Sequence, residues 1–208
     1  KLEEEVGKTF DIVVDGESLG CYPYVSDRGI TVDWEDSSAA DLDYYEYQAD
    51  ADTVAPYDFT TQVAQSERSG QIRNEDGTYN YRVRAVSTAG LVGEWSDWCG
   101  VTLDRVTPVV EITEPSDGAV LQGVVDIEGS VSDNEELSRY NLSLYAGDVD
   151  LSDGQTHSGD RLNDANWCGG TVNLTDDYSG VICDDWDTTL YDDGVYQIRL
   201  AARDAAGN

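Results

Sequence analysis

The stretch DGVYQIRLAARDAAGN, at residues 193–208, decides the fold because its pattern occurs once before, as DGTYNYRVRAVSTAG at residues 76–90. Both copies open with the turn dipeptide Asp-Gly and then alternate apolar with polar residues. The apolar residues on one face are Tyr79, Tyr81, Val83 and Ala85 in the first copy and Tyr196, Ile198, Leu200 and Ala202 in the second. This period of two predicts a half-buried β-strand in each copy.

The whole chain has the length and composition of two β domains. Its 208 residues suffice for two sandwiches of roughly 100 residues each. Turn residues recur roughly every 8 to 12 positions, the spacing of short strands, and no helical pattern of useful length is present. A Tyr between a turn and an alternating strand resembles the tyrosine corner of immunoglobulin-like domains. We therefore predict an all-β chain of two tandem immunoglobulin-like β-sandwiches.

Acidic residues dominate the charge. The chain contains 43 Asp and Glu against 12 Lys and Arg, which gives a formal net charge of -31 at pH 7. Such a field repels phosphate groups, so nucleic acid and anionic membranes are excluded as partners. Three explanations of the acidity stay open: a solvated surface, calcium ligation, and a high-salt habitat that screens the repulsion.

The cysteines indicate an oxidising compartment. Four Cys and a single His, without a CxxC motif, do not form a zinc site and favour disulfide bonds. Disulfides form outside the cytoplasm. Nothing in the sequence resembles a signal peptide or a membrane span, so we expect Lys1 to follow a processing site or a boundary within a longer protein. We therefore expect an extracellular or cell-surface segment without membrane insertion.

Residues 16–105 resemble a fibronectin type III domain. Residues 29–35, GITVDWE, place Ile30, Val32 and Trp34 on one face, as strand B with its core Trp does in that family. The stretch EWSDWCG is similar to the WSxW element whose indoles stack with arginines of the adjacent strand. The resemblance implies a structural ladder formed by Arg82, Arg84, Trp95 and Trp98.

Residues 106–208 resemble the bacterial immunoglobulin-like repeats of surface proteins. The matching phrases lie at residues 108–123, 129–133, 186–196 and 204–208. In that family the last phrase, DAAGN, leads into a final edge strand, and we expect residues 106–208 to lack that strand. The resemblance implies a fold and names no ligand.

The resemblance to immunoglobulin-like folds also implies two disulfides. First and last strands lie side by side at the edge of such a fold, so Cys21, where the first domain begins, is expected to bond Cys99 on its last strand. Cys168 and Cys183 bracket the strand pair that follows a long polar insertion and are expected to form the second bond. Closing this loop of ~15 residues stabilises the fold by about 3 kcal/mol.

Two groups of acidic residues are candidate calcium sites. At the domain boundary the fold is expected to bring together Asp104, Asp133, Asn134, Glu135 and Asp204. In the polar insertion, Asp148, Asp150 and Asp153 resemble a calcium loop, but Gly154 is one place late and Gly159 stands where a Glu is needed. A solvated acidic surface is the alternative for both groups, and no other cofactor is expected.

We expect no enzyme. Residues 16–20 match the motif G-x-S-x-G after a strand, but Pro23 follows instead of a helix, and the single histidine, His157, lies in the other domain. Glycan binding by exposed aromatic side chains stays open. Its candidates are Trp167 and Trp186, although the family phrase places Trp186 in the core.

The two ends of the chain look complementary. Residues 1–15 end in an alternating segment with Phe10, Ile12 and Val14 on one face, which resembles a last strand without a domain, whereas residues 106–208 resemble a domain without a last strand. One hypothesis is that the segment fills the second sandwich of a neighbouring copy as a donor strand, which forms a head-to-tail filament. The alternative is a piece of a longer array of repeats.

These patterns predict a structural or adhesive segment of a secreted or cell-surface protein. Its partners are adjacent repeats or neighbouring copies, with a host or glycan ligand as a further option. One alternative is a filament subunit that polymerises by strand exchange, and another is a carbohydrate-binding module of a secreted hydrolase. Exposed Tyr and Trp side chains gathered on one sheet face would favour the module.

Overall fold

A computed structural model describes these residues of the chain: 10–14, 17–26, 30–37, 40–51, 59–64, 69–71, 75–147, 149, 161–162 and 165–208. They divide into two units, Lys1–Arg105 and Val106–Ala206. Strands dominate both, and the helical structure in the described part is a 3-10 turn, η1, at Thr188–Leu190. No described helix has the length and apolar character needed to cross a bilayer. The all-β fold class is confirmed.

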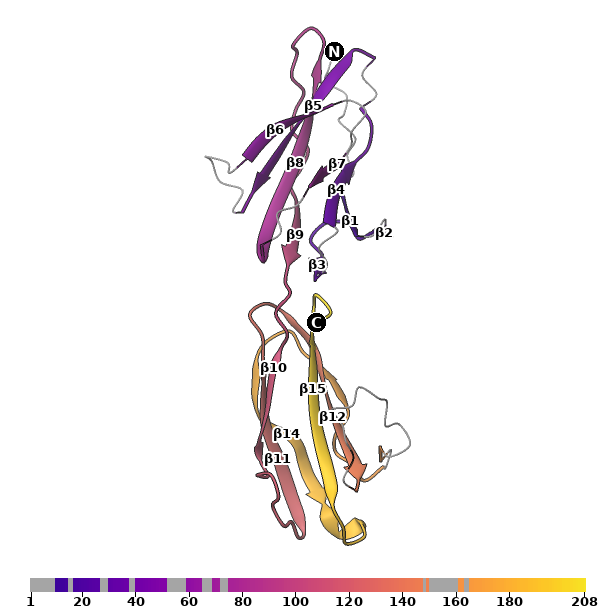
Figure 1. The fold of residues 1–208 in the computed structure, drawn as a ribbon, viewed down its shortest axis with the longest axis vertical. Coiled ribbons are helices and arrows are strands. Elements are labelled where there is room, and N and C mark those ends of the chain that lie inside the picture. The colour runs from indigo at the N-terminus through magenta and orange to yellow at the C-terminus, as the bar shows by residue number, and fades with distance from the viewer. Residues whose placement is uncertain are drawn as a thin grey trace. The chain divides into compact units, whose positions relative to one another are not determined.

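The first unit is a sandwich of two sheets. Its strands are β1 Phe10–Val14, β2 Glu17–Ser18, β3 Tyr24–Val25, β4 Ile30–Trp34, β5 Leu42–Asp50, β6 Phe59–Ala64, β7 Ser69–Gln71, β8 Gly77–Ser87 and β9 Cys99–Leu103. One sheet has the order β2–β1–β4–β7 and the other the order β3–β9–β8–β5–β6 (Figure 1). β8 therefore lies between β5 and β9, and antiparallel pairing joins it to both.

Aromatic side chains fill the core of the first unit. Val32 and Trp34 are buried, as their alternation in the sequence predicts. The Trp34 ring stacks on Tyr47 at 5.9 Å between centroids, and Tyr47 stacks on Tyr81 at 5.6 Å. Aromatic pairs of this kind add about 0.5–1.5 kcal/mol each beyond the burial of their area. These contacts join β4 of one sheet to β5 and β8 of the other.

The position of β1 corrects one prediction. Phe10–Val14 pairs antiparallel with β4, from Phe10 opposite Trp34 to Val14 opposite Ile30. This strand therefore belongs to the first unit and is not an edge strand of a neighbouring sandwich. The physical reason is that alternation specifies a strand with one apolar face but does not specify which sheet edge the strand joins. Residues 1–9 and 15 of the predicted segment lie outside the described residues.

The second unit also has two sheets. Its strands are β10 Val109–Glu114, β11 Val124–Ser132, β12 Leu137–Ala146, β13 Thr171–Asn173, β14 Tyr178–Asp187 and β15 Tyr196–Asp204. One sheet has the order β10–β11–β14 and the other the order β13–β12–β15 (Figure 1). Within the described part, β15 ends its sheet.

The repeated sequence pattern forms the same local structure in both units. Tyr79 Oη donates to the Glu75 carbonyl oxygen at 2.9 Å, and Tyr196 Oη donates to the Asp192 carbonyl oxygen at 2.8 Å. Each hydrogen bond reaches back four residues over the Asp-Gly turn and fixes the start of the following strand. β8 and β15 are thus equivalent strands of two sandwiches, as the repeat predicts.

Candidate functional site

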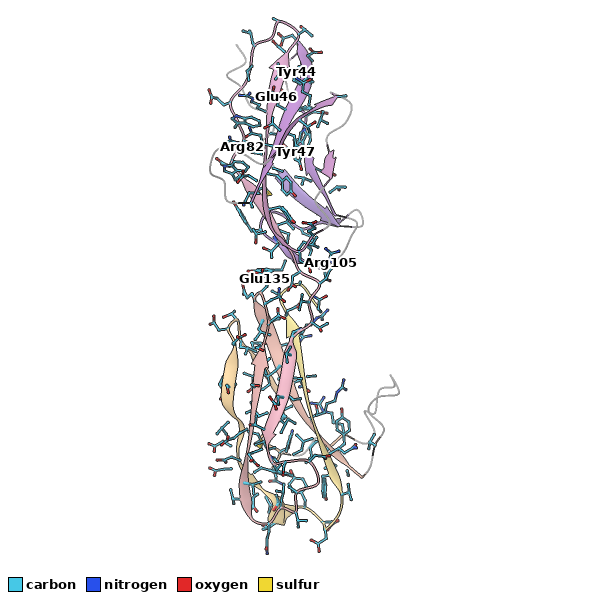
Figure 2. All side chains as sticks on the ribbon, turned by 60° about the vertical axis from the view of Figure 1, so that its left-hand side comes forward. Tyr44, Glu46, Tyr47, Arg82, Arg105 and Glu135 are labelled. Atoms are coloured by element: carbon cyan, nitrogen blue, oxygen red, sulfur yellow. A yellow bond between two sulfur atoms is a disulfide. The ribbon has the colours of Figure 1, made fainter. Side chains whose placement is uncertain are left out.

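The predicted Trp–Arg ladder forms in the first unit. The Arg82 guanidinium lies 4.7 Å from the Trp95 ring centroid and 4.4 Å from that of Trp98, and Arg84 lies 4.3 Å from that of Trp95. These are cation–π distances. Arg82 and the core residue Tyr47 extend from opposite faces of the five-stranded sheet (Figure 2), so the ladder covers its outer face.

The residues before Trp98 follow the edge of β8. Gly93 N donates to the Ala85 carbonyl oxygen at 2.9 Å, and Ser96 N donates to that of Val83 at 2.8 Å. The Val83 N–H in turn donates to Ser96 Oγ at 3.1 Å. These bonds place Trp95 over the arginines of β8.

Hydrogen bonds extend the ladder across the sheet. Arg82 Nε donates to Gln48 Oε1 at 2.8 Å, and Gln48 Nε2 donates to Thr60 Oγ1 at 3.1 Å. Arg84 Nε donates to the Glu46 carboxylate at 2.6 Å. Each guanidinium thus has an in-plane acceptor on β5 and an indole over its face, a combination that suits the planar guanidinium group. The ladder is an internally bonded structural element.

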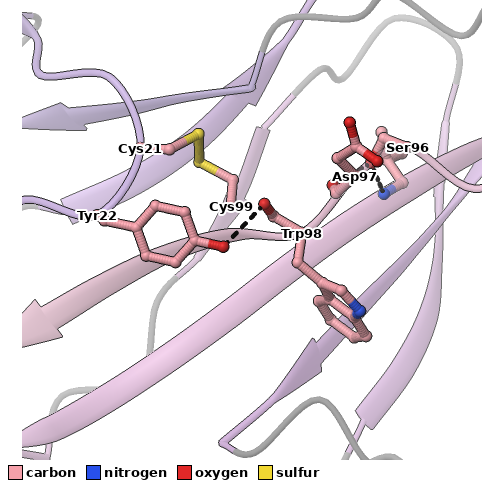
Figure 3. The surroundings of a disulfide bond; sticks show 7 residues. Cys21, Tyr22, Ser96, Asp97, Trp98 and Cys99 are labelled. Atoms are coloured by element: carbon pink, nitrogen blue, oxygen red, sulfur yellow. Dashed lines mark hydrogen bonds between the residues drawn. A yellow bond between two sulfur atoms is a disulfide. The ribbon is translucent and has the colours of Figure 1, made fainter.

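The first predicted disulfide joins Cys21 to Cys99, with their Cα atoms 5.0 Å apart (Figure 3). Tyr22 N donates to the Gly100 carbonyl oxygen at 2.6 Å, and Tyr22 Oη donates to that of Trp98 at 3.1 Å. A Cβ atom at Gly100 would lie 2.6 Å from the Tyr22 ring, so the ring requires glycine there. The bond and the ring together fasten the segment before β3 to β9.

The second predicted disulfide joins Cys168 to Cys183 of β14, with their Cα atoms 5.2 Å apart. Beside it, the Trp167 ring packs edge-on against Trp186 at 5.3 Å between centroids. Trp186 is 3% exposed, and Trp167 is partly buried against the same core. Both tryptophans that were candidates for glycan binding are thus part of the core of the second unit.

Exposed aromatic side chains do not gather on a sheet face in the part of the chain that the structure describes. Its exposed large aromatics are Tyr22 and Tyr178, which belong to different units. Glycan-binding platforms need aromatic rings that are both exposed and grouped. The arrangement that would favour a carbohydrate-binding module is therefore not observed among the described residues.

The calcium candidates at the domain boundary come from both units. Asp104 belongs to the first unit, where its N–H donates to the Val25 carbonyl oxygen at 2.8 Å. In the second unit, carboxylate oxygens of Asp133 and Asp204 lie within 4.8 Å of each other. Asp204 accepts from Asn208 N at 2.8 Å and from Asn208 Nδ2 at 2.9 Å. Two close carboxylates suit calcium, and calcium at this pair stays a prediction.

The remaining predicted calcium ligands are Glu135 and Asn134 at the domain boundary and three aspartates of the polar insertion. Glu135 N donates to Asp133 Oδ2 at 3.3 Å, so this carboxylate caps its own turn. Asn134 lies between them in the sequence. The residues of the loop-type candidate lie outside the described residues: Asp148, Asp150 and Asp153.

A third acidic group was not predicted. The pairing of β11 with β14 shifts beside Asp126, so Asp184 and Asp185 both stand opposite this single residue in a β-bulge. Carboxylate oxygens of the three lie within 4.8 Å of one another, and Asp185 N donates to Asp126 Oδ1 at 2.9 Å. The charges of Asp185 and Asp126 raise the pKa of Asp184 above its ordinary value. Alternation in the sequence gives no sign of a bulge.

The G-x-S-x-G match does not form a nucleophile elbow. Ser18 lies in the short strand β2, where the neighbouring Glu17 pairs with Val14 of β1. The chain then reaches β3 at Tyr24 without a helix. An elbow needs a strand-to-helix turn that presents the serine. His157, the single histidine, lies outside the described residues.

Comparison with protein families identifies the second unit. Residues 108–200 match the bacterial Ig domain. The predicted resemblance of residues 106–208 to bacterial immunoglobulin-like repeats is thereby confirmed. No curated protein matches the sequence of the chain.

Several solved structures match most of the length of the chain at low sequence identity and at TM-scores below 0.5. The FN1-FN3 domains of chicken CNTN1 share 14% identity over 96% of this chain and 62% of theirs, at a TM-score of 0.33. A segment of two fibronectin type III domains from chicken tenascin shares 9% identity over 94% of this chain and 89% of its own, at a TM-score of 0.36. An α-L-rhamnosidase from Dictyoglumus thermophilum shares 15% identity over 88% of this chain, at a TM-score of 0.36. The chain spans 26% of that enzyme.

Proposed function

We propose that this chain is a structural or adhesive segment of a secreted or cell-surface protein built from immunoglobulin-like repeats, without catalytic activity. The observation that carries the proposal is the match of residues 108–200 to the bacterial Ig domain, in a chain whose two units each contain a disulfide. Disulfide-bonded sandwiches in series suit an oxidising environment and a spacer or scaffold role.

The polar and aromatic side chains singled out in the sequence make contacts within their own units, which supports a structural role. Arg82 and Arg84 are bound by indoles and by acceptors on β5, and Trp186 is buried in a core. Ser18 lies in a strand instead of a nucleophile elbow. These side chains make contacts within their own units. The proposed partners are therefore adjacent repeats, which would contact the outer surface of the chain.

Location on the cell tests the proposal. Antibodies raised against the disulfide-bonded chain should label intact cells of the native source, or their culture medium, without permeabilisation. An antibody against a cytoplasmic protein is the control and should label permeabilised cells alone. Labelling of this chain that requires permeabilisation would contradict the proposal, because the disulfides would then have to persist in a reducing compartment.

A further inference from the structure

The two sheets of the second unit carry opposite charges. The strands β10, β11 and β14 contain two, two and three acidic residues and no basic residue. The strands β12, β13 and β15 contain three arginines and a single acidic residue, Asp204, which is buried at the end of β15. In a chain of formal net charge -31, a sheet whose strands expose arginines but no carboxylate is not explained by a solvated acidic surface.

All four arginines of residues 106–208 belong to one face of this second sheet. Arg139, Arg199 and Arg203 are exposed and alternate along β12 and β15 with residues of the core. Arg161 Nη2 donates to Asn141 Oδ1 of β12 at 3.3 Å, which places a fourth guanidinium beside the same outward positions. We call this outer surface of β12 and β15 the arginine face; its basic residues are Arg139, Arg161, Arg199 and Arg203.

Strand pairing on the arginine face brings like charges together. Arg139 stands directly opposite Arg203. Like charges at directly opposed positions destabilise a sheet. Neither Arg139 nor Arg199 forms an ion pair with any residue that the structure describes. The positive charge of these two side chains is therefore available to carboxylates from outside the unit.

The outer surface of the other sheet shows the converse arrangement. Glu114 stands directly opposite Glu128, and carboxylate oxygens of Asp126, Asp184 and Asp185 lie within 4.8 Å of one another. The charges of Asp185 and Asp126 raise the pKa of Asp184, which shows their mutual repulsion. A cation at this surface would relieve that repulsion. We call it the acidic face; its exposed carboxylates are Glu111, Glu114, Asp126, Glu128, Asp184 and Asp185.

Exposed valines stand among these carboxylates. Val109, Val124 and Val181 are 66%, 59% and 39% exposed, and Val181 pairs with Glu128 across the strands. An arginine side chain covers apolar surface with its aliphatic stem while its guanidinium binds a carboxylate. The acidic face thus offers a partner to both parts of an arginine side chain.

We propose that the arginine face of one copy docks on the acidic face of a second copy, so that second units stack sheet against sheet. Charge complementarity selects this partner, because each face carries the charge that would relieve the repulsion on the other. The two faces belong to the two different layers of one sandwich (Figure 1). The contact is therefore heterologous and continues from copy to copy. This inference rests on the proposed structural role and specifies its partner.

The overall negative charge of the chain opposes this stacking and limits its strength. Two chains of net charge -31 repel each other at long range. At a salt concentration of about 0.15 M, charges farther apart than about 8 Å are largely screened, whereas ion pairs in contact are screened less. Exposed ion pairs are individually weak. We therefore expect weak, reversible association, which suits repeats that are held close together on a surface.

Sedimentation velocity of the 208-residue chain at about 0.15 M salt tests the proposal. The sedimentation coefficient should rise with protein concentration. An arginine-face variant, Arg139→Gln with Arg199→Gln, should weaken self-association roughly tenfold, and an acidic-face variant, Glu128→Gln with Asp184→Asn, should do the same. The first variant makes the chain more negative and the second makes it less negative. Net repulsion alone would therefore change their self-association in opposite directions.

A mixture of the two variants tests the pairing of the faces. Each variant keeps the face that the other has lost, so the equimolar mixture should associate as strongly as the native chain. The complex should stop at pairs, because both remaining faces are altered. Restored association also shows that both variants fold. The matched control is Asp117→Asn with Asp192→Asn, which neutralises two exposed carboxylates outside both faces and should not weaken self-association.

Two results would overturn the proposal. One is stronger self-association in the acidic-face variant, which would show that net repulsion alone governs contact between copies. The other is a sedimentation coefficient of the native chain that does not change with concentration. If polygalacturonate then slowed hydrogen exchange in β12 and β15, the occupant of the arginine face would be an anionic polysaccharide instead of a second copy. Each result leaves the cell-labelling test of the structural role unaffected.

Discussion

Removal of Arg82 tests whether the Trp–Arg ladder stabilises the first unit. Arg82→Ala removes two cation–π contacts, each worth about 0.5–1 kcal/mol at a partly exposed site. It also removes the hydrogen bond to Gln48, whose side chain is largely buried and which accepts from a charged donor, for about 1.5 kcal/mol. The entropy regained by the released arginine offsets part of this. We expect a net loss of about 2 kcal/mol.

The neighbouring arginines provide a graded comparison. Arg84→Ala removes one cation–π contact and a partly exposed ion pair with Glu46, so we expect a loss of about 1 kcal/mol. Arg105→Ala is the matched control, because it removes the ion pair of Arg105 with Asp76, and this arginine lies outside the ladder. The expected loss there is at most about 0.5 kcal/mol.

Urea unfolding followed by tryptophan fluorescence measures these losses, because Trp34, Trp95 and Trp98 report the first unit, whereas the transition reported by Trp167 and Trp186 of the second unit should not shift. The midpoint should fall in the order Arg82→Ala, Arg84→Ala, Arg105→Ala, with the slope m unchanged. Arg82→Lys keeps the charge but loses the planar group, so it should recover less than half of the loss. A midpoint for Arg82→Ala equal to that of Arg105→Ala would refute the stabilising role of the ladder.

Three further changes test other parts of the molecule. Gly100→Ala should lower the melting temperature of the first unit, because its Cβ would lie 2.6 Å from the Tyr22 ring; an unchanged melting curve would contradict this packing. Asp126→Asn should raise the melting temperature at pH 7 but not at pH 3. The charges of Asp185 and Asp126 repel the ionised carboxylate of Asp184, which raises its pKa and makes the folded state bind the proton more tightly. The repulsion therefore destabilises the folded state increasingly as pH rises and Asp184 ionises. Calcium should raise the melting temperature of the second unit, and Asp133→Ala should abolish the rise; identical curves in calcium and in chelator would reject the site.

Local patterns predicted much of this fold. Strict alternation identified β4, β8 and β15, because burial on one face requires a period of two. The ladder of Arg82 and Arg84 with Trp95 and Trp98 was expected from the resemblance of the stretch EWSDWCG to the WSxW element of fibronectin type III domains. Trp186 was expected in the core and is found there. Patterns of this kind are visible because each depends on residues close together in the chain.

Several features that depend on pairing register, or on contacts between residues far apart in the sequence, were not predicted. The pattern of Phe10–Val14 fits any open sheet edge, and β4 of the same unit is the one that it joins. The clustering of Asp126 with Asp184 depends on a bulge, which alternation does not encode. The packing of Tyr22 on Gly100 joins residues far apart in the sequence, and no local pattern predicted it.

Single-molecule extension of the chain, pulled from both ends, tests most directly the claim of two separate sandwiches that each contain their own disulfide. Without reductant we expect two unfolding events. The residues between Cys21 and Cys99 and between Cys168 and Cys183 should not contribute to the extended length, because the disulfides bridge them. The sequence separations of 78 and 15 residues predict that reduction lengthens one event by roughly 270 Å and the other by roughly 50 Å. A single event, or lengths that reductant does not change, would contradict the account.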